Sequence, residues 1–151
     1  MLHAGLDLSR RKLDVCLLNH DGEQLDQLAV APDVDSLRTL ARRVDEVHAE
    51  PVCAVVESMT GARFVHDTLE QEGWDVEIAD AQKVKGLAPL ACKTDKIDSM
   101  VLAVLSHRDL VPAIWLPDPR VREQRELARF RMHLVKHKSA LKNRVDSTLI
   151  N

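Results

Sequence analysis

The chain has 151 residues, of which 45% are hydrophobic and 30% are charged. This composition predicts one compact globular domain with a hydrophobic core and excludes a disordered chain. No apolar run is long enough to cross a bilayer and no leader-like segment follows Met1, so we expect a cytoplasmic protein with no membrane partner. Cys16, Cys53 and Cys92 lie among apolar neighbours without metal-ligand spacing, which favours reduced thiols over a zinc site or a disulfide.

Charge is distributed unevenly along the chain. Residues 1–117 contain 12 Lys and Arg against 20 Asp and Glu, a net charge of −8. Residues 118–151 contain 9 against 4, a net charge of +5. A basic tail on an acidic body indicates either a polyanionic partner or contact with an acidic surface of the same protein.

Three strands are expected at the start of the chain, over residues 3–9, 12–18 and 23–30. The dipeptide Asp21-Gly22 is a strong hairpin signal between the second and third strands. Short connections on both sides of the middle strand predict an antiparallel meander.

Two carboxylates lie inside or at the end of apolar strand-like runs. Asp7 falls on the opposite face of its strand from Leu6 and Leu8, and Glu57 ends the continuous apolar run 52–56. Asp7 could be a solvated residue at a strand edge, but the flanking Gly5, which permits a close backbone approach, favours a site. For Glu57, an exposed residue at a strand end and a site are equally good explanations, because ligands gather beyond the carboxyl ends of strands in α/β sheets.

Helices and strands alternate over the middle of the chain. We expect a helix between Asp33 and Pro51 and a second one closed by Gly73. The remaining elements are a strand over residues 74–78, a short helix over residues 81–87 that breaks near Pro89, and a helix that begins at Thr94 or Asp95 and ends near His107.

The stretch from Lys93 to Asp98 places Asp95 and Asp98 three residues apart, on one face of the helix that it opens. Thr94 as an N-cap and acids in the first helical turn are one sufficient explanation. The other is a site for one or two divalent metal ions, Mg²⁺ or Mn²⁺, built from Asp7, Glu57, Asp95 and Asp98, because these cations prefer oxygen ligands.

The pattern of the C-terminal part predicts a connector followed by one long helix. We expect a domain over residues 1–111, a proline-rich connector over residues 112–119 and a helix over residues 120–151 that stops without a C-cap signal. Leu127, Leu134 and Leu141 recur at seven-residue spacing, which is typical of a coiled-coil arm that forms a homodimer or a higher oligomer. The basic residues expected to contact nucleic acid are Lys93, Arg125, Arg129, Arg131, Lys136, Lys138, Lys142 and Arg144.

An ordered set of motifs resembles a known family over nearly the whole chain. The motifs are Gly5-Leu6-Asp7-Leu8-Ser9, Glu57 with Thr60-Gly61, Lys93-Thr94-Asp95-Lys96-Ile97-Asp98, and Leu141-Lys142-Asn143-Arg144. They resemble the N-terminal domain of DEDD transposases of the insertion-sequence one-ten family, recombinases guided by a bridge RNA.

The resemblance implies an α/β fold of the ribonuclease-H-like (RuvC-like) kind, with three layers, a five-stranded mixed sheet and a long C-terminal coiled-coil helix. Its first three strands are antiparallel, and the fourth and fifth run parallel to the first. The resemblance also implies that Asp7, Glu57, Asp95 and Asp98 are the catalytic, metal-binding acids. DNA and a structured guide RNA are the implied partners, and a C-terminal domain absent from this chain is expected to supply a serine nucleophile.

Two other functions remain open. The chain could be a non-catalytic module that binds nucleic acid and dimerises, in which case the acids are structural. It could also be an actin-like ATPase domain, which shares the Gly-Leu-Asp strand opening. That class needs glycine-rich phosphate-binding hairpins, and Leu8-Ser9-Arg10 supplies none.

Overall fold

The computed structural model describes residues 1–91 and 98–150, with side chains described at residues 1–87 and 99–150. This part of the chain forms two compact units, Met1–Ile114 and Trp115–Asn151. The division between the units falls inside the connector that we expect over residues 112–119.

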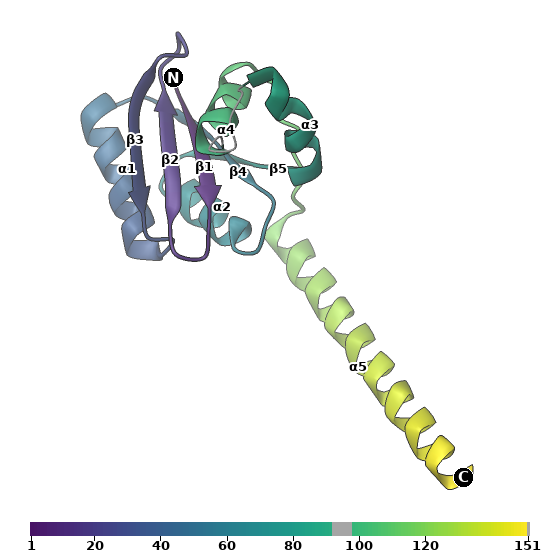
Figure 1. The fold of residues 1–151 in the computed structure, drawn as a ribbon. Coiled ribbons are helices and arrows are strands. Elements are labelled where there is room, and N and C mark those ends of the chain that lie inside the picture. The colour runs from purple at the N-terminus through teal and green to yellow at the C-terminus, as the bar shows by residue number, and fades with distance from the viewer. Residues whose placement is uncertain (92–97, 151) are drawn as a thin grey trace. The chain divides into compact units, whose positions relative to one another are not determined.

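The first unit is built around a five-stranded mixed sheet with the strand order β3-β2-β1-β4-β5 (Figure 1). The strands are β1 (Leu2–Leu8), β2 (Leu13–Leu18), β3 (Gln24–Val30), β4 (Val52–Glu57) and β5 (Asp75–Ala79). The first three are antiparallel neighbours, whereas β4 is parallel to β1 and β5 is parallel to β4. The predicted meander and the predicted strand directions are therefore confirmed.

Helices cover both faces of this sheet, which gives three layers. The helices of the first unit are α1 (Val34–His48), α2 (Ala62–Gln71), α3 (Ala81–Ala91) and α4 (Asp98–His107). Helices α1 and α2 pack together on one face, and α4, which contacts β1, β2 and β4, lies with α3 on the other (Figure 1). The predicted three-layer α/β fold with a five-stranded mixed sheet is confirmed. The expected break near Pro89 is wrong, because α3 continues to Ala91.

Local side-chain hydrogen bonds explain where the first elements begin and end. Asn19 Oδ1 accepts hydrogen bonds from the backbone N–H groups of Asp21 (3.0 Å) and Glu23 (2.9 Å), and Gly22 adopts a positive φ of 82°. This closes the β2–β3 hairpin. Asp33 caps α1 by accepting a hydrogen bond from the backbone N–H of Ser36 at 2.9 Å.

The alternation of side chains along the strands separates two apolar layers. Leu6 and Val15 are register partners with no exposed surface, and they lie on the face covered by α1 and α2. On the other face, Val55 packs in a cluster with Val101 and Leu102 of α4. Burial on both faces is typical of a continuous apolar run such as residues 52–56 of β4.

Gly5 sets the distance between α4 and the sheet. A Cβ on Gly5 would overlap with the backbone carbonyl of Ser99 and with the backbone nitrogen of Ala103. Ala103 also packs with Cys16, the register partner of Gly5 on β2. The predicted close approach at Gly5 is confirmed, and the element that approaches is α4.

The free edge of β5 is covered by the segment that follows α4. Ile114 N–H donates to the carbonyl of Ile78 at 2.7 Å, and Asp80 N–H donates to the carbonyl of Pro112 at 3.0 Å. The first part of the expected connector is thus hydrogen-bonded to the sheet.

The second unit contains α5 (Pro119–Ile150), which confirms the predicted long C-terminal helix. Asp118 Oδ1 accepts a hydrogen bond from the backbone N–H of Arg120 at 2.9 Å, and Pro119 occupies the first helical position, where a missing N–H costs nothing. Among the residues that the structure describes, no helix combines the length and the apolar character needed to span a membrane.

Replacing Gly5 with alanine is expected to destabilise the first unit by about 3 kcal/mol or more, since the added methyl group meets backbone atoms that no side-chain rotation can move. Urea denaturation followed by circular dichroism measures the change. Gly86→Ala is the matched control, because nothing lies within 4 Å of a Cβ at this helical position and alanine favours the helix. Equal stability of the two variants would contradict the packing that we describe.

Candidate active site

Asp7 and Glu57 lie at the ends of neighbouring parallel strands. The last residues paired between β1 and β4 are Leu6 and Val56, and Asp7 and Glu57 are the next residues on the two strands. Adjacent strands lie about 4.8 Å apart, so the two residues are neighbours across the sheet. Both are partly buried.

Both carboxylates belong to the face that α4 covers. Side chains alternate along a strand, so Asp7 shares a face with Gly5, and Glu57 shares a face with Val55. Gly5 meets the backbone of α4, and Val55 packs against the apolar side of α4. The two acids therefore lie on one face, at the carboxyl ends of their strands.

The direction of α4 brings its first turn to the same end of the sheet. Ser99, in the first turn, meets Gly5. Ser106, in the last turn, contacts His3 at the opposite end of β1, with 2.9 Å between its Oγ and the imidazole Nδ1. Helix α4 thus runs antiparallel to β1, and its amino end at Asp98 lies toward Asp7.

The other predicted acids are described only in part. Asp98 is the first residue of α4, but its side chain, together with Lys93 and Asp95, lies outside the described residues. Among the side chains that are described, no three His, Cys, Asp or Glu residues are arranged to hold a metal ion. The structure brings together Asp7 and Glu57, and the predicted four-acid cluster stays a prediction.

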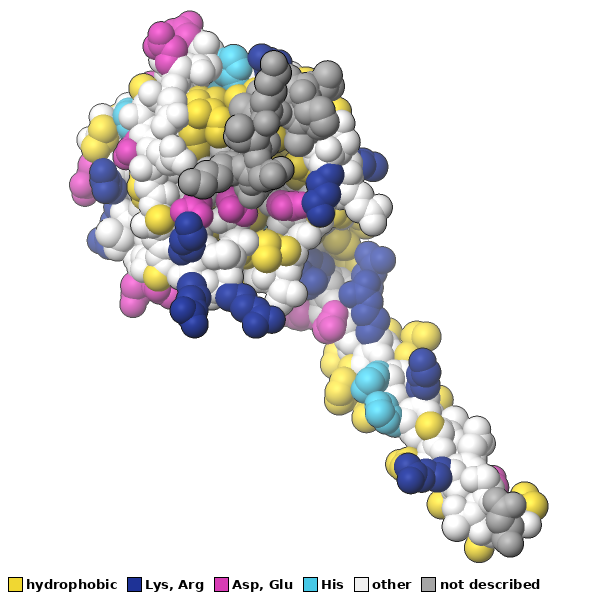
Figure 2. Space-filling model, in the orientation of Figure 1, with side chains coloured by type: hydrophobic (Ala, Val, Ile, Leu, Met, Phe, Trp, Pro, Cys, Tyr) yellow, Lys and Arg dark blue, Asp and Glu magenta, His cyan; other side chains and the backbone are white. Residues whose placement is uncertain are grey.

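A third carboxylate, Asp14, lies beside this pair and was missed from the sequence. It is the register partner of Asp7 on β2 and shares the face of Cys16, which packs against α4. Figure 2 shows acidic side chains gathered on the face that carries α4. In the sequence, Asp14 is only one polar residue of an alternating strand. Its position beside Asp7 follows from the register of β1 and β2, which the sequence does not give.

Lys12 pairs with Asp14, with 2.6 Å between its Nζ and Asp14 Oδ2. The hydrogen bond and the charge of Asp14 raise the pKa of Lys12, and the nearby charge of Asp7 raises it further. Because a higher pKa keeps the amine protonated, Lys12 stays cationic at the edge of the acidic group.

The donor atoms at these strand ends suit a hard divalent cation. Carboxylate oxygens are the ligands that Mg²⁺ and Mn²⁺ prefer, and partial burial leaves room for water and a substrate oxygen to complete the coordination. Asp7 and Glu57 therefore fit such an ion by their chemistry.

The predicted nucleic-acid contacts on the long helix are all exposed. Arg129 pairs with Glu126 at 3.4 Å along the helix. The exposed basic residues of α5 that we predicted are Arg125, Arg129, Arg131, Lys136, Lys138, Lys142 and Arg144. Leu127, Leu134 and Leu141 are 70%, 52% and 64% exposed, so a single α5 leaves its heptad leucines in water.

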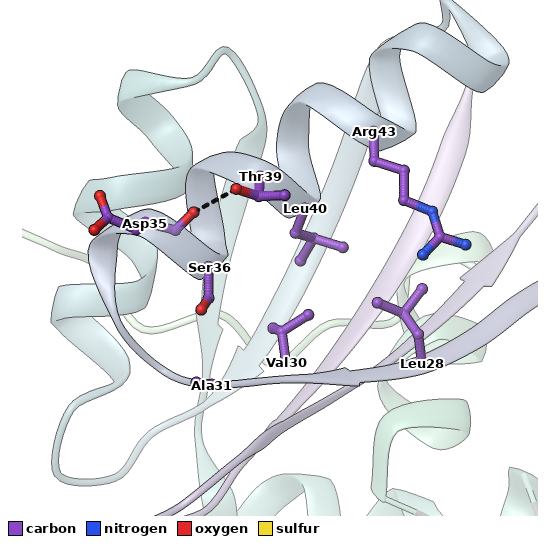
Figure 3. Close-up of a pocket in the computed structure, with 8 residues that line it drawn as sticks. All are labelled: Leu28, Val30, Ala31, Asp35, Ser36, Thr39, Leu40 and Arg43. Atoms are coloured by element: carbon purple, nitrogen blue, oxygen red, sulfur yellow. Dashed lines mark hydrogen bonds between the residues drawn. The ribbon is translucent and has the colours of Figure 1, made fainter.

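A pocket of about 330 Å³ lies between β3 and α1, away from the acids (Figure 3). Leu28, Val30 and Leu40 supply its apolar surface, and Arg43 lies at its rim. Leu28 is the register partner of Val15, which lies on the α1 and α2 face. The pocket therefore belongs to the face opposite Asp7 and contains none of the predicted site residues.

Comparison with known proteins gives one family and distant structural likenesses. The sequence matches the transposase family DEDD_Tnp_IS110 over residues 4–151. A fowlpox virus resolvase solved with Holliday junction DNA has a TM-score of 0.44 at 10% identity, covering 73% of this chain and 99% of the resolvase. A ROK family protein from Streptococcus pneumoniae TIGR4, solved with sucrose, has a TM-score of 0.38 at 16% identity. This match covers 60% of this chain and 38% of the ROK family protein. No curated protein has a significantly similar sequence.

Proposed function

Because the chain belongs to the IS110 family of DEDD transposases, we propose that its first unit carries out metal-dependent phosphodiester chemistry on DNA. The observation that supports this proposal is the placement of Asp7 and Glu57 side by side at the ends of β1 and β4. Two partly buried carboxylates on one face repel each other, and such an arrangement is typical of a site that a cation completes.

In this proposal Asp7 and Glu57 hold Mg²⁺ or Mn²⁺, and Asp95 and Asp98 complete one or two ion sites. When bound, the ion activates the attacking oxygen and stabilises the leaving oxygen of the displaced phosphodiester. The rigid strands β1 and β4 fix the first two carboxylates, and the contact between Gly5 and Ser99 fixes the position at which α4 begins.

The proposed partners are DNA and a structured guide RNA. The basic residues of α5, and Lys93, would neutralise phosphates of either nucleic acid, and each such contact would steepen the salt dependence of binding. The resemblance that we noted in the sequence assigns the serine nucleophile to a further C-terminal domain. We therefore propose that this chain supplies the metal-dependent acids and part of the nucleic-acid surface, and that strand exchange needs that domain.

Titration of the purified chain with Mn²⁺, followed by calorimetry, tests the metal site. We expect saturable binding in the wild type and at least tenfold weaker binding in Asp7→Asn and in Asp98→Asn, because each substitution removes a charged oxygen ligand. Asp75→Asn is the matched control, since this exposed aspartate lies at the opposite, amino end of β5. Equal affinity in all four proteins would refute a site at these acids.

The exposed leucines of α5 favour a second role in assembly. Leu127, Leu134 and Leu141 occupy one side of the helix, and a second copy of α5 would cover them in a coiled coil. If the acids are only structural, this assembly and nucleic-acid binding are the whole function. Nucleic-acid binding would then be unaffected by Asp7→Asn, and Mn²⁺ would not bind.

Substitution Leu134→Glu is expected to shift a dimer to the monomer, because it places a charge in the leucine row. Analytical ultracentrifugation at several protein concentrations measures the change. Met132→Glu is the control, since Met132 is 72% exposed and lies about 200° around the helix from Leu134. Identical sedimentation of both variants and the wild type would exclude pairing through this row.

A further inference from the structure

The turn between β1 and β2 presents three consecutive cations. Arg10, Arg11 and Lys12 are all exposed, and we call them the cationic turn. Ser9 fixes its backbone: Ser9 N–H and Ser9 Oγ both donate to the carbonyl of Lys12 at 2.8 Å, and Lys12 N–H donates back to Ser9 Oγ at 3.2 Å. These three hydrogen bonds hold the backbone of the cationic turn in one conformation.

The cationic turn lies at the same end of the sheet as the candidate active site. It begins three residues after Asp7 and ends two residues before Asp14, the register partner of Asp7. Lys12 reaches the Asp14 carboxylate, which belongs to the face that α4 covers. At least one cation of the turn is therefore directed toward the face where Asp7 and Glu57 lie.

The negative charge at the strand ends opposes the approach of DNA to the candidate site. Asp7, Asp14 and Glu57 repel the phosphates that must come close to them, and the Debye length of about 8 Å at physiological salt does not screen neighbours at this range. Positive charge beside the acids offsets that repulsion. Within the part of the chain that the structure describes, neither Arg10 nor Arg11 takes part in an ion pair.

We propose that Arg10, Arg11 and Lys12 hold the phosphate backbone of DNA next to Asp7, as positioning residues for the reacting strand. This inference rests on the proposed function, because the acids define which phosphate the turn would hold. DNA is favoured over RNA as the occupant because the turn adjoins the acids that would act on a DNA phosphodiester.

The pairing of Lys12 with Asp14 is compatible with this role. The Lys12 side chain is 58% exposed and that of Asp14 is 28% exposed. Exposed ion pairs contribute little to stability, so Lys12 loses little when it turns from Asp14 to a phosphate. Asp14 keeps the flexible amine near the site while no DNA is bound.

Salt-dependent binding to a short fluorescein-labelled DNA duplex, measured by anisotropy in EDTA, tests the inference on the whole chain. Lys12→Gln is expected to reduce the slope of log Kd against log salt by about 0.9, the effect of one lost phosphate contact, and to weaken binding roughly eightfold at about 0.1 M salt. Arg10→Gln combined with Arg11→Gln should reduce the slope by about twice as much. Lys12→Arg should retain the wild-type slope.

Arg42→Gln is the matched control, because it removes one exposed charge from α1 on the opposite face of the sheet. An unchanged slope in the turn variants, an equal loss in Arg42→Gln, or no binding by the wild type would overturn the inference. A slope change seen with an RNA duplex and not with DNA would overturn it in favour of RNA.

The two proposals fail in different measurements. EDTA removes divalent ions, so the anisotropy slopes do not depend on the metal site. A chain that binds Mn²⁺ through Asp7 but shows unchanged slopes refutes only the cationic turn. A chain whose slopes change as expected but that binds no Mn²⁺ refutes only the metal chemistry.

Discussion

The backbone contact between α4 and Gly5 is the constraint on which the candidate site depends. Helices normally pack at a distance set by the side chains between them and their partner. At Gly5 there is no side chain, and the carbonyl of Ser99 and the nitrogen of Ala103 occupy the space that a Cβ would fill. Since Asp7 follows two residues later on the same face, one glycine fixes how close the start of α4 comes to the first carboxylate.

Strand direction then determines which acids meet. Asp7 and Glu57 are neighbours because β1 and β4 are parallel and in register, so their carboxyl ends coincide. Asp14 joins them because β2 is antiparallel and begins where β1 ends. Three partly buried carboxylates therefore share one face at neighbouring strand ends. Lys12 forms an ion pair with one of them, Asp14.

Features that depend on nearby residues were predictable from the sequence. The hairpin was predicted from Asp21-Gly22, and hydrogen bonds to Asn19 close it. The helix expected after Asp33 is α1, which Asp33 caps. The expected break near Pro89 is wrong, because α3 continues two residues past the proline to Ala91. The local preference of one residue is a weak guide to where a helix ends.

Contacts between residues that lie far apart in the sequence could not be predicted from the sequence. Gly5 was recognised as a close-approach residue, but its partner Ser99 lies more than ninety positions away. Asp14 was overlooked for the same reason, since only the register with Asp7 gives it a role. The short connections predicted the antiparallel meander of β1, β2 and β3, whereas the parallel directions of β4 and β5 came from the family resemblance.

The net charge of the first 117 residues conceals what a phosphate would meet at the strand ends. A sum of −8 predicts repulsion of nucleic acid, yet a potential at the surface reflects charges within about one Debye length, not the total. At the β1–β2 turn three cations lie within a few residues of Asp7, and hydrogen bonds from Ser9 hold their backbone in place. Under the proposal that a DNA phosphate approaches Asp7, the β1–β2 turn supplies the positive charge nearest to it in the sequence, because this turn directly follows β1.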